Sequence, residues 1–193
     1  MNIPPMVHDS IQNKYDKQIV DFKSSGLLKS MHHSSTCSAV IGSVGAQDFL
    51  YNKNLSEEVF GPFTLVVNCN SADQMLAVAS ALEGQLTVSI LGDPSDKGIA
   101  KVLLSKLRTK AGRILFEGVP TGVAVTDAMQ HGGPFPASSD SRFTSVGTDA
   151  IYRWLRPVAY QDCPDNLLPD ALKNKNPLGL QRNVNGKITG SEI

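Results

Sequence analysis

Two adjacent carboxylates, Glu57 and Glu58, precede an aromatic residue, Phe60, where Gly61-Pro62 interrupts the chain. Carboxylate oxygens accept hydrogen bonds from sugar hydroxyl groups, and an aromatic ring packs against a flat heterocycle. Held together on one turn, these residues would suit recognition of a sugar and a heterocycle. The same residue types are also typical of two solvated loop charges beside a core phenylalanine, and residue types alone favour that second interpretation.

The elements around the turn must position these side chains. The β-branched, apolar run Phe63 to Val67 predicts a buried strand entered through the Gly61-Pro62 turn. A turn at a strand end holds a side chain still while leaving it accessible. Upstream, apolar residues recur at spacings of four, four and three, which predicts one face of an amphipathic helix that Gly26 ends. That face comprises Ile11, Tyr15, Ile19 and Phe22.

Helices and strands alternate after the turn. Ser71 and Gln74 predict a capping box that begins a helix. Strands are expected at 85–91 and 112–116, with a helix between them that carries Ile99, Val102, Leu103 and Leu107. This order predicts an α/β fold with a parallel sheet covered on its faces by helices. A further helix runs from Val146 until Pro157 stops it, residues 157–161 predict a short strand, and an irregular tail follows from Cys163.

Composition excludes several classes of function. The 193 residues are enough for one domain with a sizeable core, and 18 basic residues balance 18 acidic ones, which does not favour a nucleic-acid partner. No apolar run is long enough to span a membrane, and the first residues do not resemble a signal peptide. Cys37, Cys69 and Cys163 are widely separated, as expected of free thiols in the cytoplasm. His32, His33 and Cys37 match no zinc spacing, so we expect an exposed connection and no metal site.

The order of residues in the turn is similar to a known signature. Residues 58–62, Glu-Val-Phe-Gly-Pro, closely resemble the Glu-x-Phe-Gly-Pro signature of the NAD(P)-dependent aldehyde dehydrogenases. The likeness extends from about Pro5 to about Thr189, and it is greatest for the subgroup containing 2,5-dioxovalerate (α-ketoglutaric semialdehyde) dehydrogenase and bacterial fatty aldehyde dehydrogenase. Further matching segments occur in order at 84–87, 112–123, 131–134, 139–142 and 144–147.

The resemblance implies roles for the turn and for the rest of the chain. Glu58 is expected to hold the nicotinamide ribose and Phe60 to pack against the nicotinamide, while Glu57 points elsewhere. Residues 1–155 would form the C-terminal part of an incomplete catalytic domain. Residues 156–193 would add a strand that pairs with a neighbouring subunit and an irregular tail. The whole enzyme would oxidise a semialdehyde or fatty aldehyde to a carboxylate, through a cysteine thiohemiacetal, with NADP or NAD as cofactor.

The chain departs from the family in what it lacks. The family's cysteine nucleophile lies farther upstream of the signature than this chain extends, and Cys37, Cys69 and Cys163 do not share its context. No Gly-x-Gly-x-x-Gly phosphate turn occurs. We therefore assign no catalytic residue and expect the chain alone to be inactive. Two hypotheses remain: a fragment of an aldehyde dehydrogenase, or a non-catalytic interaction protein that pairs with intact dehydrogenase subunits. A hydrolase using His131 is disfavoured, since no Gly-x-Ser-x-Gly turn occurs.

Three matters stay open at the level of sequence. The aldehyde and the choice between NAD and NADP would be read by the missing half. A truncated product, a broken reading frame and one half of a split gene all fit the hypothesis of a fragment. Glu117 stands where the family usually has Asn, and a buried charge is costly unless it is paired. Either a partner lies near Glu117, or the position has relaxed.

Overall fold

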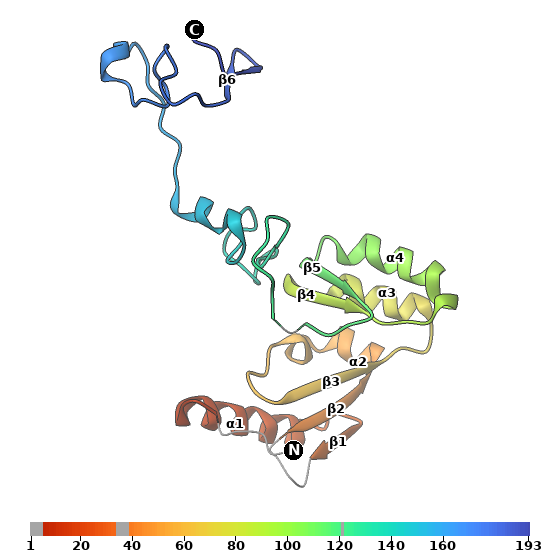
Figure 1. Ribbon diagram of the computed structural model, residues 1–193. Helices are drawn as coiled ribbons and strands as arrows, with labels where there is room; N and C mark the ends of the chain where they lie inside the picture. The colour runs from red at the N-terminus through yellow and green to blue at the C-terminus, as the bar shows by residue number, and fades with distance from the viewer. Residues whose placement is uncertain (1–5, 34–38, 121) are drawn as a thin grey trace. The chain divides into compact units, whose positions relative to one another are not determined.

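The computed structural model describes residues 6–33, 39–120 and 122–193, so Cys37 lies outside the described residues (Figure 1). The chain divides into two compact units, Met1–Arg153 and Trp154–Ile193. All the buried hydrophobic residues of the described chain belong to the first unit, and all but Ala46 and Ala111 form three clusters. The first unit therefore contains the candidate site and the apolar core that positions it.

The first helix, α1 (Asp9–Ser25), ends at Gly26 as predicted, and Tyr15 and Ile19 of the predicted face are buried. The side chain of His8 caps it by accepting a hydrogen bond from the Ser10 amide, and Gly26 ends it with a left-handed φ of 66°. Tyr15 and Ile19 are buried against Val40. The Phe22 ring stacks on the Phe63 ring with centroids 5.5 Å apart, so α1 is fixed directly to the strand that follows the turn.

Three strands form the first sheet: β1 (Ser30–His33), β2 (Val40–Gly45) and β3 (Phe63–Asn68). β2 pairs with β1 in antiparallel and with β3 in parallel orientation, with Val40 opposite Phe63. His32 and His33 lie on β1 rather than in a connection, while His32 is exposed as expected.

Helices cover one face of this sheet. Side chains alternate along a strand, and those of Val40, Val44 and Leu65 point into the clusters that contain α1 and helix α2 (Ala46–Tyr51). On the opposite face, the side chains of Ile41 and Val66 are 51% and 43% exposed. Within the described residues, helices therefore cover one face of this sheet, whereas the sequence predicts helices on both faces.

The second sheet pairs β4 (Gln85–Ile90) with β5 (Ala111–Phe116) in parallel orientation. Helix α3 (Ala72–Ala81) precedes β4, and helix α4 (Lys97–Leu107) connects the two strands after a short 3₁₀ turn, η2 (Pro94–Asp96). Ala79, Ile90 and Leu107 form the buried cluster between helices and strands. Val102, predicted on the buried face of α4, is 44% exposed.

The capping of α3 differs slightly from the prediction. The Ser71 side chain accepts a hydrogen bond from the Gln74 amide at 3.2 Å, as a capping box requires. The Gln74 side chain, however, accepts from the Asn70 amide at 2.8 Å rather than from the Ser71 amide. The helix start is therefore stabilised by the two predicted side chains, with one hydrogen bond displaced by a residue.

The α/β class and the parallel pairs are confirmed, but the parallel strands belong to two sheets. Among the described residues β3 pairs with β2 alone and β4 with β5 alone, although α3 connects β3 to β4 directly (Figure 1). The apolar packing beneath the helices is continuous, because Leu82, just after α3, packs against the buried clusters of both sheets.

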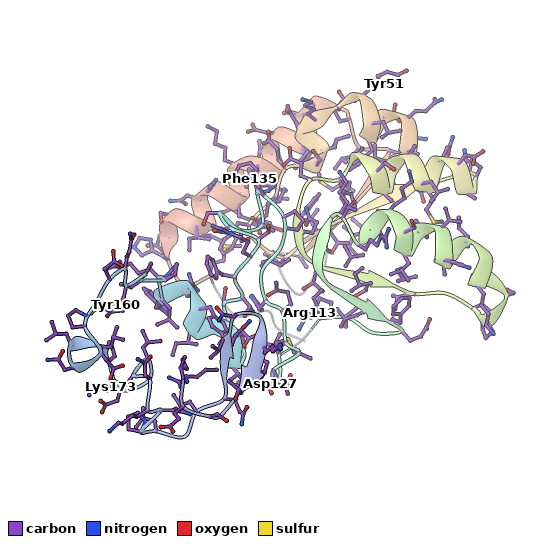
Figure 2. All side chains as sticks on the ribbon, turned by 90° about the horizontal axis from the view of Figure 1, so that it is seen from above. Tyr51, Arg113, Asp127, Phe135, Tyr160 and Lys173 are labelled. Atoms are coloured by element: carbon purple, nitrogen blue, oxygen red, sulfur yellow. The ribbon has the colours of Figure 1, made fainter. Side chains whose placement is uncertain are left out.

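The segment after β5 consists mainly of turns. The Thr144 hydroxyl organises part of it by accepting hydrogen bonds from the amides of His131 and Val146. Phe135 of this segment is 81% exposed (Figure 2). Tyr51, at the end of α2, is 86% exposed. The helix predicted from Val146 is a 3₁₀ helix, η3 (Thr148–Trp154).

The C-terminal unit corrects two predictions. Residues 157–161 pair with no strand of the described chain, so the strand expected there is not present in the single chain. The tail is not irregular throughout. It contains a 3₁₀ turn, η4 (Asp165–Leu167), and a hairpin of β6 (Arg182–Val184) with β7 (Lys187–Thr189). Asn185 and Gly186 form the hairpin turn with φ of 51° and 84°. An oligomerisation role for residues 156–193 stays a prediction.

Candidate functional site

The turn that carries Glu57, Glu58 and Phe60 begins where a short 3₁₀ helix, η1 (Lys53–Ser56), ends. Its Leu55 is 3% exposed and packs against Val44 and Phe49. After the two carboxylates, Val59 packs against the cluster of Tyr15, Ile19 and Val40. The chain is therefore anchored by an apolar side chain on each side of the carboxylate pair.

Gly61 and Pro62 fix the turn against α1 and β2. A Cβ atom at Gly61 would collide with the Tyr15 ring and lie 2.7 Å from the Met6 methyl group, so only glycine fits. The Tyr15 hydroxyl donates to the Pro62 carbonyl at 3.2 Å, and the Val40 amide donates to the same oxygen at 2.9 Å. The Phe63 amide donates to the Gly61 carbonyl at 2.7 Å. The backbone that displays Glu58 and Phe60 is thus closely constrained.

Glu58 is exposed and lines an open cleft. The cleft has a volume of about 770 Å³ and is also lined by Glu57, by residues 83–87 at the start of β4 and by Pro136. The Glu58 carbonyl accepts a hydrogen bond from the Gln18 side chain at 3.5 Å, whereas no residue of the described chain donates to the Glu58 carboxylate. Its oxygens are therefore available to hydroxyl donors of a bound molecule.

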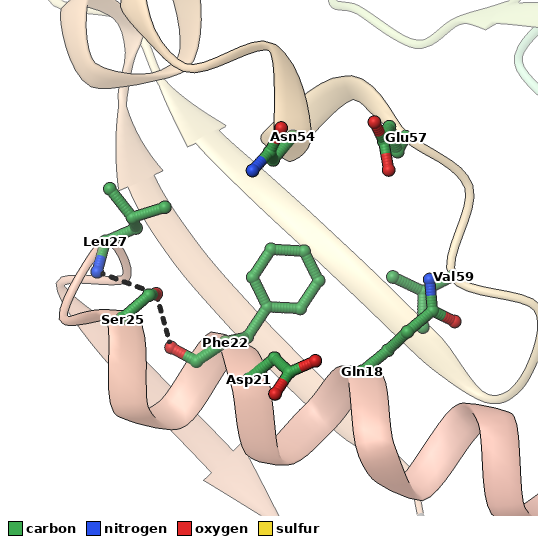
Figure 3. Close-up of a pocket in the computed structure, with 8 residues that line it drawn as sticks. All are labelled: Gln18, Asp21, Phe22, Ser25, Leu27, Asn54, Glu57 and Val59. Atoms are coloured by element: carbon green, nitrogen blue, oxygen red, sulfur yellow. Dashed lines mark hydrogen bonds between the residues drawn. The ribbon is translucent and has the colours of Figure 1, made fainter.

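Glu57 borders two cavities. It lines the same cleft as Glu58 and also a second cavity of about 220 Å³ between the turn and α1. Figure 3 shows that second cavity, with Phe22 on one side and Asn54 and Glu57 on the other. Both carboxylates of the pair are thus within reach of the cleft, and the structure does not distinguish them by exposure.

Phe60 is not a core residue. Its side chain is 58% exposed, which excludes the interpretation of Phe60 as buried packing. It is not among the residues that line the cleft beside Glu58. The ring is nevertheless held at the surface of a constrained turn, two residues from Glu58. The exposed ring of Phe60 has apolar surface available to a bound molecule.

A third cleft lies at the carboxyl ends of β4 and β5 and was not anticipated from the sequence. It has a volume of about 700 Å³ and is lined by Ile90, Lys97, Lys101, Phe116 and Glu117, among others. Clefts at the carboxyl ends of parallel strands are common binding places. The only signal in the sequence was the strand–turn–helix pattern at Gly92-Asp93-Pro94.

Glu117 borders this third cleft and is exposed, so the cost of a buried charge does not arise. Its backbone adopts a left-handed φ of 51°, and its side chain accepts a hydrogen bond from the Gly92 amide at 3.3 Å. Asn adopts this conformation more readily than Glu does. The departure from the family pattern therefore costs backbone strain rather than charge burial.

Other features of the described residues narrow the chemistry. No group of three or more His, Cys, Asp or Glu in this part of the chain is arranged to hold a metal ion. No helix among these residues combines the length and the apolar character that crossing a membrane requires. Hydrogen bonds from the Arg142 side chain and amide hold the pKa of the partly exposed Asp140 carboxyl at about 2, below its usual 3.8.

Curated relatives match most of this chain but only a small part of their own length. An α-ketoglutaric semialdehyde dehydrogenase 2 of Azospirillum brasilense is 55% identical over 144 residues, 75% of this chain and 27% of the relative. An α-ketoglutaric semialdehyde dehydrogenase of Acinetobacter baylyi is 56% identical over 138 residues, 72% of this chain and 26% of the relative. The chain thus spans about a quarter of the length of these relatives. No family model matches the sequence.

Solved structures share the fold at low identity. A betaine aldehyde dehydrogenase of Staphylococcus aureus in complex with NAD⁺ matches 78% of this chain and 29% of its own, with a TM-score of 0.55 and 15% identity. A Δ-pyrroline-5-carboxylate dehydrogenase of Mycobacterium tuberculosis bound with NAD matches 85% of this chain and 31% of its own, with a TM-score of 0.58 and 17% identity. The fold of this chain is therefore a partial aldehyde dehydrogenase fold.

Proposed function

Since this chain shares its sequence and fold with part of the aldehyde dehydrogenases, we propose that it is the part of such an enzyme that binds the nicotinamide end of the cofactor. The whole enzyme would oxidise an aldehyde to a carboxylate with NAD or NADP. The names of the curated relatives favour a semialdehyde as substrate. The observation that carries the proposal is the free Glu58 carboxylate, held over an open cleft by a turn that tolerates only glycine at position 61.

Glu58 would act by fixing the ribose. Its two oxygens accept hydrogen bonds from the two ribose hydroxyl groups, and each charge-assisted bond contributes about 1.5–3 kcal/mol. The bound nicotinamide supplies the acceptor for the hydride that leaves the substrate. Because the Gly61-Pro62 backbone is hydrogen-bonded to Tyr15 and Val40, the carboxylate is preorganised, and its binding energy serves to orient the ring.

Phe60 would cover one face of the nicotinamide ring. A ring that is 58% exposed has apolar surface to bury against a ligand, and aromatic packing of this kind contributes about 0.5–1.5 kcal/mol beyond the area buried. Phe60 does not line the cleft that Glu58 lines. We infer that the ring forms the wall of a site whose other walls come from residues outside this chain.

The chain by itself would be inactive, because oxidation of the aldehyde needs a cysteine thiolate and a phosphate-binding turn that we find in none of its motifs. Mixing the chain with NAD⁺ or NADP⁺ and short or long aldehydes should produce no reduced nicotinamide. Any measurable turnover by the purified chain would contradict the proposal, and turnover that Cys37→Ser abolishes would assign the nucleophile to Cys37.

A second candidate function is a non-catalytic partner of intact dehydrogenase subunits. The observation that favours it is the exposed apolar run that begins the C-terminal unit, where Leu155, Val158 and Tyr160 are 56%, 57% and 49% exposed. Such a run is a surface for pairing with another subunit. Homo-oligomers of the whole enzyme could use the same surface.

The decisive experiment joins this chain to the remaining part of the Azospirillum brasilense relative and measures the hydride step under single-turnover conditions. Glu58→Gln should slow nicotinamide reduction by roughly ten- to a hundredfold, as expected when a charge-assisted hydrogen bond is lost. Glu57→Gln is the matched control and should change the rate by less than about threefold. Equal effects of the two substitutions would return both carboxylates to the status of solvated loop charges.

A further inference from the structure

The turn of the C-terminal hairpin, Asn185-Gly186, is a chemically reactive pair. Of the asparagines in this chain, only Asn185 is followed by glycine. Glycine carries no side chain, so nothing on Gly186 shields its amide nitrogen from the side chain of Asn185. An asparagine side-chain carbonyl carbon and the next amide nitrogen can close a five-membered ring. Asn185 is therefore the asparagine of this sequence that is most open to such a reaction.

Both reacting groups are accessible in the structure. Asn185 and Gly186 are exposed, and a Cβ atom at Gly186 would meet no other atom within 4 Å. The pair Val184 and Lys187 closes the hairpin, so the two turn residues lie outside the ladder. Within the described residues, the Gly186 amide and the Asn185 side chain make no hydrogen bond. No contact in the chain therefore has to break to free the two groups.

The conformation of the turn nevertheless opposes the reaction. Asn185 and Gly186 have φ of 51° and 84°, in the left-handed region that a two-residue hairpin turn needs. Closing the ring requires the Asn185 backbone to rotate out of that conformation, until the Gly186 nitrogen faces the side-chain carbonyl carbon. The hairpin must open first, so the local stability of the C-terminal unit sets the rate of the reaction.

A polar network holds the hairpin closed. The Asn176 side chain donates to the Gly190 carbonyl, just after β7, at 2.7 Å. The Arg182 side chain, at the start of β6, donates to the Ser191 carbonyl at 3.1 Å. A hairpin of three residue pairs is marginally stable by itself, and no hydrophobic residue of this unit is buried. Opening of the turn therefore depends on a few polar contacts.

We propose that Asn185-Gly186 is a site of spontaneous deamidation that unfolds the C-terminal unit as the protein ages. The Gly186 nitrogen forms a bond to the side-chain carbonyl carbon of Asn185. The bond from that carbon to the side-chain nitrogen breaks, and ammonia leaves with the proton that the Gly186 amide gives up. Water then opens the resulting succinimide at either carbonyl, which leaves aspartate or isoaspartate at position 185. Water is the only co-reactant, and no group is oxidised or reduced.

The two products affect the hairpin differently. Aspartate keeps the length of the backbone, and Asp-Gly suits the same turn as Asn-Gly. Isoaspartate routes the backbone through the side chain, which adds one carbon atom to a two-residue loop. Because loop length sets the register of a hairpin, the pairing of Val184 with Lys187 is lost. Isoaspartate thus separates the strands that carry the contacts of Arg182, whereas aspartate leaves them paired.

The first experiment measures the reaction in the native chain. The chain is incubated at mildly alkaline pH and digested with trypsin, which cleaves after Arg182 and Lys187. The resulting peptide holds both Asn185 and the exposed Asn183, which precedes a β-branched residue. Mass spectrometry should show that Asn185 converts roughly tenfold or more faster than Asn183, because glycine leaves the attacking nitrogen unhindered. Asn176→Ala should accelerate the conversion of Asn185 by a similar factor, since the hairpin opens more often.

The second experiment separates the change in backbone length from the change in charge. Freshly purified Asn185→Asp is the matched control, because it carries the new charge on an unaltered backbone. Amide exchange of residues 164–193 should be roughly tenfold or more faster in the aged chain and unchanged in Asn185→Asp. Treating the aged chain with an isoaspartate methyltransferase and S-adenosylmethionine converts isoaspartate to aspartate, and it should restore slow exchange.

Each contrary outcome overturns one stated step. Equal conversion of Asn183 and Asn185 would overturn the site. A rate at Asn185 that Asn176→Ala leaves unchanged would overturn the control by hairpin opening. Exchange in Asn185→Asp as fast as in the aged chain would assign the unfolding to charge instead of backbone length. Slow exchange after full conversion would overturn the unfolding of the unit.

Discussion

The turn at 57–63 and the C-terminal unit, Trp154–Ile193, hold their backbones in opposite ways. The turn is fixed by apolar packing, with Val59 and the Phe63 ring against α1 and with Gly61 in contact with Tyr15. The C-terminal unit contains no buried hydrophobic residue. Its buried residue is Asn176, whose side chain makes three hydrogen bonds, to the Leu180 amide and to the Leu180 and Gly190 carbonyls.

The difference teaches where each region is vulnerable. Apolar packing is distributed over many atoms, so the loss of one contact is shared by its neighbours. A polar network depends on a few groups, and an unpaired buried group costs about 1–3 kcal/mol. Arg182 extends the network by donating to the carbonyls of Lys173 and Ser191. We therefore expect single polar substitutions to disorder the C-terminal unit and only steric ones to disturb the turn.

The largest effect is expected for Asn176→Ala. The substitution removes three hydrogen bonds of about 1 kcal/mol each and places alanine at a φ of 49°, so the unit should lose about 4 kcal/mol of local stability. Amide exchange of residues 164–193 should then accelerate while that of α1 and β3 is unchanged. Asn174→Ala, at an exposed side chain nearby, is the control and should be neutral.

Gly61→Ala tests the apolar side of the comparison. The added methyl group would meet the Tyr15 ring and the Met6 side chain, and overpacking of this kind costs about 1–3 kcal/mol. Thermal unfolding of the first unit should shift downward. Gly98→Ala is the matched control, since open space surrounds this helical position and the change should stabilise the chain by about 0.5–1 kcal/mol. A stabilising Gly61→Ala would contradict the close contact.

Glu117→Asn tests how much the left-handed backbone at Glu117 destabilises the first unit. Asn176 and Glu117 both adopt left-handed backbones, with φ of 49° and 51°. Asn suits that conformation and Glu does not, so the substitution should raise the free energy of unfolding by about 1 kcal/mol. Glu117→Gln removes the charge and keeps the strain, and it should have little effect. Equal stabilisation by both variants would assign the effect to charge.

The smallest effect is expected at Asp140, where a polar contact is exposed rather than buried. The pKa of Asp140 is lowered from 3.8 to about 2 by hydrogen bonds from Arg142, so this contribution is present above pH 3.8 and is lost as the pH falls through about 2. Arg142→Gln should move the pKa of Asp140 back toward 3.8 in an NMR titration and leave stability at neutral pH almost unchanged. A midpoint already near 3.8 in the native chain would show that the contact does not form in solution.

Several elements follow from local sequence alone. The period of Tyr15 and Ile19 predicted α1, the Ser71 and Gln74 pair predicted the start of α3, and the apolar run after Pro62 predicted β3. These three predictions are confirmed because caps, periodicity and β-branched residues act within a few residues of one another. The hairpin at 182–189 was equally local, with Asn185-Gly186 at its turn as in type I′ hairpins. The surrounding Pro and Asn residues are typical of irregular chain and outweigh this local signal.

The sequence and the tertiary structure each determine part of the candidate site. The sequence by itself determined that Glu58, Phe60 and Gly61 share one turn before a strand, since that depends on their order and on the turn chemistry of Gly-Pro. Only the tertiary structure decided that Phe60 is exposed, that Glu57 lines the same cleft as Glu58, and that the parallel strands form two sheets. Exposure and strand pairing depend on residues far apart in the chain, because no local pattern records which neighbour a strand edge will meet.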